Sequence, residues 1–333
     1  MNRKVVLYGA AGHTGRFIAE ELKRQGFAPV IAGRDVSKLA PIAASLGAEA
    51  CEVEVTEPEA LDAMLAGTDL LINAAGPFGD TSPPLIEAAI RAGIPYLDIT
   101  AEPFVAQGIF DSLGDREIGT IVAPAFGFFG ALGDLLVTAA LGDWAGADQV
   151  ELAFALDRWQ PTKGTLLAGK RRAGRRLVRA NGRLETREPT QPPPKGYWDF
   201  AQPFGRQPAV GEFSTVDVAT ISRHLDVGSI STWINEAPLT DLAQATEPLN
   251  GATGPSEQQF LIEAVVRRGR EVRRASASGR DIYAVTAPIV VEAIRWILDG
   301  RSRATGVVAP GELFDARAFL AALPSQAISI QLQ

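Results

Sequence analysis

Short apolar runs alternate with amphipathic segments along the first 125 residues of the chain. Six runs predict strands, at residues 5–8, 29–32, 52–55, 70–74, 96–99 and 120–123. The segment between the first two runs has helical spacing, with Phe17, Ile18 and Leu22 on one side and charged residues on the other. Because parallel strands need long crossover connections, this alternation predicts a doubly wound parallel α/β sheet.

Polar residues that precede three of the helical segments predict where those helices begin. Ser37 is expected to cap the second helix, and Thr56 with Glu59 is expected to form a capping box for the third. Ser82, which two prolines follow, is expected to open the fourth helix.

The pattern changes after Pro124. Three β-rich segments follow, at residues 150–156, 215–221 and 229–234. Residues 189–208 contain six prolines and are expected to form a long ordered loop. We therefore expect a second, α+β domain with a mixed or antiparallel sheet.

A strong helical stripe returns after Tyr283 and includes Ile289, Ile294 and Ile297. We expect three parts: a parallel-sheet domain at residues 1–125, the α+β domain at 126–280, and C-terminal helices at 281–333.

Composition and charge exclude several classes of protein. One cysteine and two histidines provide neither a disulfide nor the usual zinc ligands, so no metal site is expected, and a reducing cytoplasm fits. The net charge of −7 argues against nucleic-acid binding. Only four apolar residues precede Gly9, too few for a secretory signal. The apolar stretch at 118–141 contains Asp134 and Pro124, so no membrane span is expected.

The charge is uneven along the chain. Residues 151–200 contain eleven Lys and Arg against five Asp and Glu, a balance of +6. The densest part, residues 170–176, either faces an anionic substrate tail or carrier, or forms a solvated helix face.

A glycine-rich loop directly follows the first strand. Glycine spacing in this loop allows a tight turn and a close approach of a pyrophosphate to the backbone, and the next helix supplies free N–H donors. The candidate cofactor-binding residues in the loop are Gly9, Ala11, Gly12, His13, Thr14 and Gly15.

The second strand ends at Arg34, where NAD-selective sites place an acidic residue. A guanidinium suits a 2′-phosphate instead, so the expected cofactor is NADP(H). The fourth strand leads into Ala74, Ala75, Gly76 and Pro77, small residues that leave room for the nicotinamide ribose.

These motifs resemble the saccharopine dehydrogenase-like oxidoreductases, which include saccharopine reductases and trans-acting enoyl reductases. The resemblance rests on residues 9–15, 32–34, 72–80, 92–102 and 283–287, with a weaker similarity at 163–165. It implies an NADP-binding Rossmann domain at residues 1–125, an inserted mixed-sheet substrate and dimerisation domain at 126–280, C-terminal helices at 281–333 that return to the Rossmann domain, and a homodimer.

The resemblance also places Asp98, Thr100 and Glu102 near the nicotinamide edge of the cleft. A carboxylate there is able to orient a substrate amine or stabilise an iminium, whereas Thr100 alternatively caps the next helix. The aromatic loop at 124–130 is expected either to roof an apolar substrate pocket or to pack between domains.

No proton donor stands out from the sequence. None of the four tyrosines has a lysine four residues later, which excludes the short-chain dehydrogenase mechanism. The candidate catalytic residues are Tyr283, Lys163 and Asp98, and His224 is a weaker candidate donor.

The leading hypothesis is an NADPH-dependent reductase that transfers hydride to an imine, ketone or activated alkene of a small substrate. An anionic or carrier-linked substrate would suit the basic segment. The alternative is a non-catalytic Rossmann protein that senses NADP(H) or binds a partner.

Overall fold

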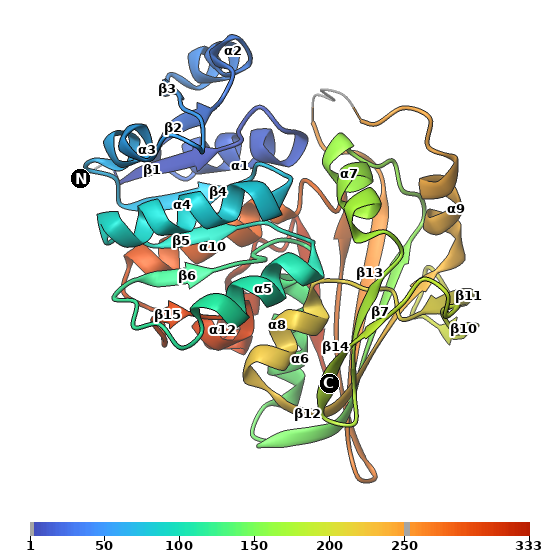
Figure 1. Ribbon diagram of the computed structural model, residues 1–333. Helices are drawn as coiled ribbons and strands as arrows, with labels where there is room; N and C mark the ends of the chain where they lie inside the picture. Colours follow the sequence, from blue (N-terminus) through green and yellow to red (C-terminus); the bar gives the residue numbers. More distant parts are fainter. Residues whose placement is uncertain (1–2, 250–253) are drawn as a thin grey trace.

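The structure, a computed structural model, describes residues 3–249 and 254–333. Figure 1 shows two sheets, with helices packed around the first and between the two. The first sheet is entirely parallel, and in the described residues its strands are β1 (Lys4–Tyr8), β2 (Ala28–Gly33), β3 (Glu49–Glu52), β4 (Leu70–Asn73), β5 (Tyr96–Asp98), β6 (Ile121–Ala123) and β15 (Gly306–Val307). Their order is β15-β6-β5-β4-β1-β2-β3, which confirms the expected Rossmann sheet.

Helices connect these strands and cover the sheet. They are α1 (His13–Arg24), α2 (Val36–Leu46), α3 (Pro58–Leu65), α4 (Phe78–Ala92), α5 (Pro103–Leu113) and, from the C-terminal part, α10 (Thr286–Leu298). Helix α10 packs against α1. The C-terminal part thereby helps to complete the Rossmann domain, and it also supplies β15, a strand too short for the sequence pattern to reveal.

The second sheet is mixed. Its strands in the described residues are β7 (Gly146–Leu156), β8 (Arg176–Ala180), β9 (Arg183–Arg187), β10 (Lys195–Asp199), β11 (Arg206–Gly211), β12 (Asp226–Asn235), β13 (Gln259–Arg268), β14 (Glu271–Arg280) and β16 (Ile328–Leu332). Strands β7 and β12 are parallel, and the other pairings are antiparallel. The last strand, β16, pairs with β14, so the C-terminal part contributes to both sheets.

The remaining helices are α6 (Ala131–Leu141), α7 (Lys163–Arg172), α8 (Asp217–His224), α9 (Glu236–Gln244), α11 (Pro310–Leu313) and α12 (Ala316–Ala322). Helix α6 is buried on nearly all sides, because it packs on β13 and β14 and also contacts α8, α11 and α12. A single hydrophobic core therefore runs from the Rossmann sheet through α6 to the second sheet. No helix within residues 3–249 and 254–333 has the length and apolar character to cross a membrane.

Two sequence expectations for the second sheet are wrong. Residues 215–221 were expected as a strand but belong largely to α8, where Val218, Ala219 and Ile221 are buried together with Asp217 and Thr220. The segment is short and rich in the β-branched residues Val, Thr and Ile, and a short run of this kind fits a strand as well as a buried helix. Residues 189–208 contain β10 and part of β11 at the edge of the sheet, a position that tolerates proline.

Three predicted helix starts are also wrong. Helix α2 begins after Asp35, and the Ser37 hydroxyl donates to the Asp35 carboxylate instead of capping. Helix α3 begins at Pro58 without the capping box. Helix α4 begins one turn before Ser82, because the prolines lie inside the helix and not at its first position.

The interior beside α6 contains a cluster of ionisable side chains. Asp134 is fully buried and lies 2.8 Å from Nε2 of His224. Burial lowers the pKa of His224, but the charge and hydrogen bond of Asp134 outweigh burial and raise it overall. Asp217 is also fully buried, and burial together with the Asp134 charge raises its pKa to about 7. Its carboxylate lies so close to Gly133 that a Cβ at that position would clash with it.

The Asp217 pKa predicts how stability depends on pH. An acid whose folded pKa lies above its unfolded value stabilises the fold only at low pH. The free energy of unfolding should therefore fall, by an amount on the order of 3 kcal/mol, as pH rises from about 4 to about 7. Asp217→Asn should flatten this decline in urea unfolding curves, whereas the exposed control Asp226→Asn should not. Equal pH dependence in all three proteins would contradict the prediction.

Candidate dinucleotide site and interdomain cleft

The glycine loop lies at the carboxyl edge of the Rossmann sheet, between β1 and α1. Gly9 has a φ of +93°, and a Cβ there would lie 2.6 Å from the backbone nitrogen of Ala75. Only glycine allows the first loop to pack this closely on the loop after β4. Gly15 likewise packs directly against the Gly9 carbonyl.

The N-terminus of α1 is open to a ligand. Gly12 is its N-cap, no side chain caps the helix, and the first turn contains no acidic residue. The first backbone N–H groups are therefore free to bind an anion, and the helix dipole favours one. Ala11 and Thr14 flank this point and are half-buried. The geometry fits the pyrophosphate of a dinucleotide.

Arg34 follows β2 and is exposed. Within the described residues its guanidinium forms no ion pair, whereas the nearby Lys38 is paired with Asp35 at 2.6 Å. Burial and the charge of Glu54 raise the pKa of the neighbouring Tyr8 to about 12, and the charge of Arg34 opposes them. In the part of the chain that the structure describes, Arg34 is thus a cation without an ion pair at the end of β2, and a 2′-phosphate suits it.

The loop Ala74, Ala75, Gly76 and Pro77 lies at the same edge, where it is half-buried to exposed. The buried Asn73 fixes it, because its side-chain oxygen accepts a hydrogen bond from the Ala75 N–H at 3.0 Å. The Asn73 amide in turn donates to Thr81 at 3.0 Å and to the Tyr96 hydroxyl at 3.2 Å. The structure therefore brings all the predicted cofactor residues to one edge.

Asp98 is fully buried beneath this edge. Its carboxylate accepts hydrogen bonds from the hydroxyls of Tyr96 (2.8 Å) and Ser82 (3.1 Å) and from the N–H groups of Thr100 (3.0 Å) and Ala125 (2.9 Å). Burial raises its pKa, against these four bonds. An arrangement of this kind favours a positioning role for Asp98 over contact with substrate.

Two neighbours of Asp98 have local roles. The Thr100 hydroxyl accepts from the Glu102 N–H at 3.1 Å just before α5, and does not act as the N-cap, which is Glu102. The Glu102 carboxylate accepts from the Phe78 N–H at 3.0 Å, and burial raises its pKa. Glu102 thus connects the start of α5 to the start of α4.

Tyr283 lies opposite the glycine loop, with its ring edge-on to that of His13 at 5.3 Å. Its hydroxyl accepts from Trp159 Nε1 at 2.9 Å and from the Thr162 N–H at 3.3 Å, and it lies 3.0 Å from the Thr165 hydroxyl. Burial raises the pKa of Tyr283 and lowers that of His13. Both side chains are therefore neutral at pH 7.

The other candidate donors lie in different places. Lys163 is the first residue of α7, next to Thr162, and is exposed. His224 is paired with Asp134 in the interior beside α6, away from this network. The sequence did not single out Trp159 and Thr162, because only the fold brings them to Tyr283.

Packing, one of the two roles expected for the aromatic loop at 124–130, is present in the structure. Phe126 is buried against Phe314 and Phe319, which is packing in the core. Phe129 instead joins a cluster at the second sheet, whose other rings are Phe154, Trp159 and Phe213.

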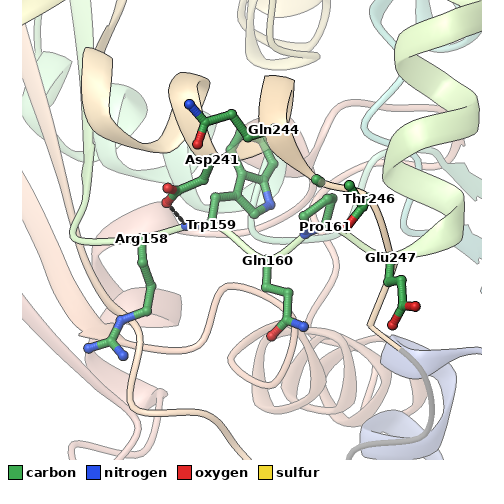
Figure 2. A pocket seen from close by; sticks show the side chains of 9 residues that line it. Arg158, Trp159, Gln160, Pro161, Asp241, Gln244, Thr246 and Glu247 are labelled. Carbon is green, nitrogen blue, oxygen red and sulfur yellow. Dashed lines mark hydrogen bonds between the residues drawn. The ribbon is translucent and has the colours of Figure 1, made fainter.

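A polar cavity of about 410 Å³ adjoins this cluster at Trp159. It lies between residues 158–161 and the end of α9, and the Trp159 N–H donates to Asp241 at 2.9 Å. In Figure 2 the side chains of Arg158, Gln160 and Glu247 extend downward, away from Asp241 and Gln244 of α9. The cavity is thus a feature of the second domain and not part of the dinucleotide edge.

Arg34 provides a test of cofactor choice. Arg34→Gln should weaken NADPH binding by about 30-fold or more, because a charge-assisted contact to the 2′-phosphate is worth about 2 kcal/mol or more, and should leave NADH binding unchanged. Lys38→Gln removes the same charge from a residue already paired with Asp35 and should change neither affinity more than about threefold. Calorimetric titration measures the affinities for NADPH and NADH. Equal effects of the two variants on NADPH affinity would refute the assignment of Arg34 to the 2′-phosphate.

Comparison with known proteins agrees with this geometry. The family model for the saccharopine dehydrogenase NADP binding domain matches residues 5–115. The trans-acting enoyl reductase of Mycobacterium tuberculosis is 30% identical over 142 residues, which cover 40% of this chain and 34% of that protein. The saccharopine dehydrogenase-like oxidoreductase of Bos taurus is 29% identical over 152 residues, 39% of this chain and 35% of the bovine protein. The match thus spans about a third of the length of these relatives.

Among solved structures, apo saccharopine dehydrogenase (L-Glu forming) from Saccharomyces cerevisiae aligns over 100% of both chains, with a TM-score of 0.68 and 12% identity, and so shares the fold. The expected resemblance and the NADP(H) cofactor are confirmed. Residues 5–115 thus match the NADP-binding domain of the saccharopine dehydrogenases, and the chain as a whole shares its fold with the yeast enzyme.

Proposed function

We propose that this chain is an NADPH-dependent oxidoreductase that reduces an imine, ketone or activated alkene of a small organic substrate. The observation that carries the proposal is the open N-terminus of α1 at Gly12 together with the free Arg34 at the same sheet edge. The names of the relatives, an enoyl reductase and a saccharopine dehydrogenase-like oxidoreductase, support the same class of reaction.

In this proposal the Rossmann domain binds and orients the cofactor. The N–H groups at His13 and Thr14 bind the pyrophosphate, and Arg34 binds the 2′-phosphate. Ala74 to Pro77 leave space for the nicotinamide ribose. When bound, NADPH supplies the hydride. Asp98 positions the loops around this space through its four hydrogen bonds.

Tyr283 is our candidate proton donor. Its raised pKa keeps the hydroxyl protonated at neutral pH, so the proton is available. Two N–H groups, from Trp159 and Thr162, already point at the hydroxyl oxygen and would stabilise the phenolate that remains. Lys163, at the start of α7, adds a positive charge beside this network.

The proposal extends to the whole protein. We infer domain limits near residues 125 and 280, a cytoplasmic location that suits the single free cysteine, Cys51, and a homodimer with a substrate that is free or carrier-linked. Size-exclusion chromatography with light scattering tests the dimer directly.

The reaction is tested by following NADPH absorbance with panels of imines, ketones and enoyl thioesters. Consumption that depends on one of these substrates supports the proposal. Tight NADPH binding without turnover on any panel would instead favour the alternative, a protein that senses NADP(H) without catalysis.

Tyr283→Phe should lower kcat by about 100-fold or more, the usual contribution of a general acid, and leave NADPH affinity unchanged. Because the Tyr283 pKa is raised, wild-type kcat should not decline between pH 6 and 9 through loss of this proton. Thr165→Val, which removes a partner but keeps the phenol, is the control and should retain most activity. Full activity of Tyr283→Phe would exclude Tyr283 as the donor.

A further inference from the structure

The basic residues of α7 and the turn after it have different partners. Arg171 forms two hydrogen bonds to Asp80 of α4, at 2.9 and 2.7 Å. Arg175 lies over the ring of Phe104 of α5, 4.8 Å from its centroid. These contacts join α7 to the Rossmann domain, and Figure 1 shows α7 at the end of the second sheet that faces that domain.

Arg176 is also neutralised. It is buried, pairs with Glu212 at 3.1 Å and donates to the Gln191 carbonyl at 2.7 Å. Lys170, by contrast, is exposed to solvent, which stabilises its charge without a partner.

Arg172 differs from all of these. It is half-buried, and in the part of the chain that the structure describes it forms no ion pair. Its one hydrogen bond, of 3.2 Å, runs from Nη1 to the Ser214 carbonyl. Burial lowers the pKa of Arg172, and the neighbouring charge of Arg176 lowers it further. A guanidinium has five N–H donors, so most of its binding capacity is unused in a place where an unpaired charge is costly.

The position of Arg172 connects it to the proposed reaction site. Arg172 follows Thr165 by seven residues, so the two lie on the same face of α7, about 10 Å apart along the helix axis. Thr165 contacts the Tyr283 hydroxyl. Ser214, the partner of Arg172, directly follows Phe213, whose ring packs against Phe129 and Trp159.

We propose that Arg172 is the specificity-determining residue of this site and binds a carboxylate on the substrate. The reacting group would lie at Tyr283, the intervening carbon chain along the aromatic cluster, and the carboxylate about two turns of α7 away. This inference rests on the proposed function and adds to it the chemical class of the substrate.

A carboxylate fits the local charge better than a phosphate does. Arg176 is already balanced by Glu212, so Arg172 contributes a single uncompensated positive charge. A monoanionic carboxylate neutralises this charge and accepts two N–H bonds from the planar guanidinium. A dianionic phosphate would leave a net negative charge in a partly desolvated place.

Calorimetric titration of the NADP⁺-loaded protein with hexanoate, hexyl phosphate and 1-hexanol tests the proposal. Hexanoate should bind at least about tenfold more tightly than 1-hexanol, because only the carboxylate forms a charge-assisted pair. Arg172→Gln should weaken hexanoate binding by about 10- to 100-fold and leave 1-hexanol unchanged, with Arg172→Lys intermediate. Lys170→Gln removes one charge from the same helix and should change hexanoate binding less than about twofold.

Three results would overturn the proposal: no effect of Arg172→Gln, an equal effect of Lys170→Gln, or tighter binding of hexyl phosphate that depends on Arg172. NADPH binding to the wild-type protein is measured separately. If NADPH binds but hexanoate does not, only this inference fails. If NADPH does not bind, the proposed function fails, and hexanoate titration of the protein without dinucleotide still tests Arg172.

Thermal unfolding separates a binding role from a structural one. Removal of an unpaired, half-buried charge should leave Tm unchanged or raise it, so Arg172→Met should unfold no earlier than the wild type. A fall in Tm of more than about 4 °C would show that Arg172 stabilises the fold through Ser214, and would count against the proposal.

Discussion

The buried carboxylate of Asp98 is the interaction on which the cleft depends. It accepts hydrogen bonds from Ser82 in α4, from Thr100 after β5 and from Ala125 after β6. The segments that follow three neighbouring parallel strands are thereby tied to one group. Because a buried charge is stable only when such donors surround it, the segments and the carboxylate stabilise each other. The floor of the cleft is therefore formed before any ligand binds, which reduces the entropy that binding must overcome.

The opposite wall depends on contacts between residues far apart in the chain. Tyr283 precedes α10, which packs on the Rossmann domain, yet its hydroxyl is bonded to Trp159, Thr162 and Thr165 of the second domain. Its ring also lies against His13 of the glycine loop. One side chain thus joins the dinucleotide loop to the start of α7. Any shift of α7 relative to the Rossmann domain would have to break this network together with the Arg171–Asp80 pair.

The sequence predicts the first domain well because its signals are local. The glycine loop, the end of β2 at Arg34 and the small residues after β4 are each read from a few adjacent positions. The roles of Asp98 and Arg172 are not local. Aspartate is a common catalytic residue, but the surroundings of Asp98 are those of a structural group. Arg172 and Lys170 both carry a positive charge, and only the fold shows that Arg172 is half-buried whereas Lys170 is exposed. The expectation of a strand at α8 is wrong for a similar reason, since a short run rich in Val, Thr and Ile fits a strand as well as a helix until the fold is known.

The two proposed anion sites differ in their dielectric surroundings. Arg34 is exposed, so its proposed contact with the 2′-phosphate is screened by salt. Arg172 is half-buried, so one charge there interacts more strongly than several on the surface. Pairs such as Arg171 with Asp80 and Arg176 with Glu212 offset part of the positive balance of residues 151–200. Recognition in this cleft therefore depends on where an unpaired charge is partly buried, and not on how many charges the segment contains.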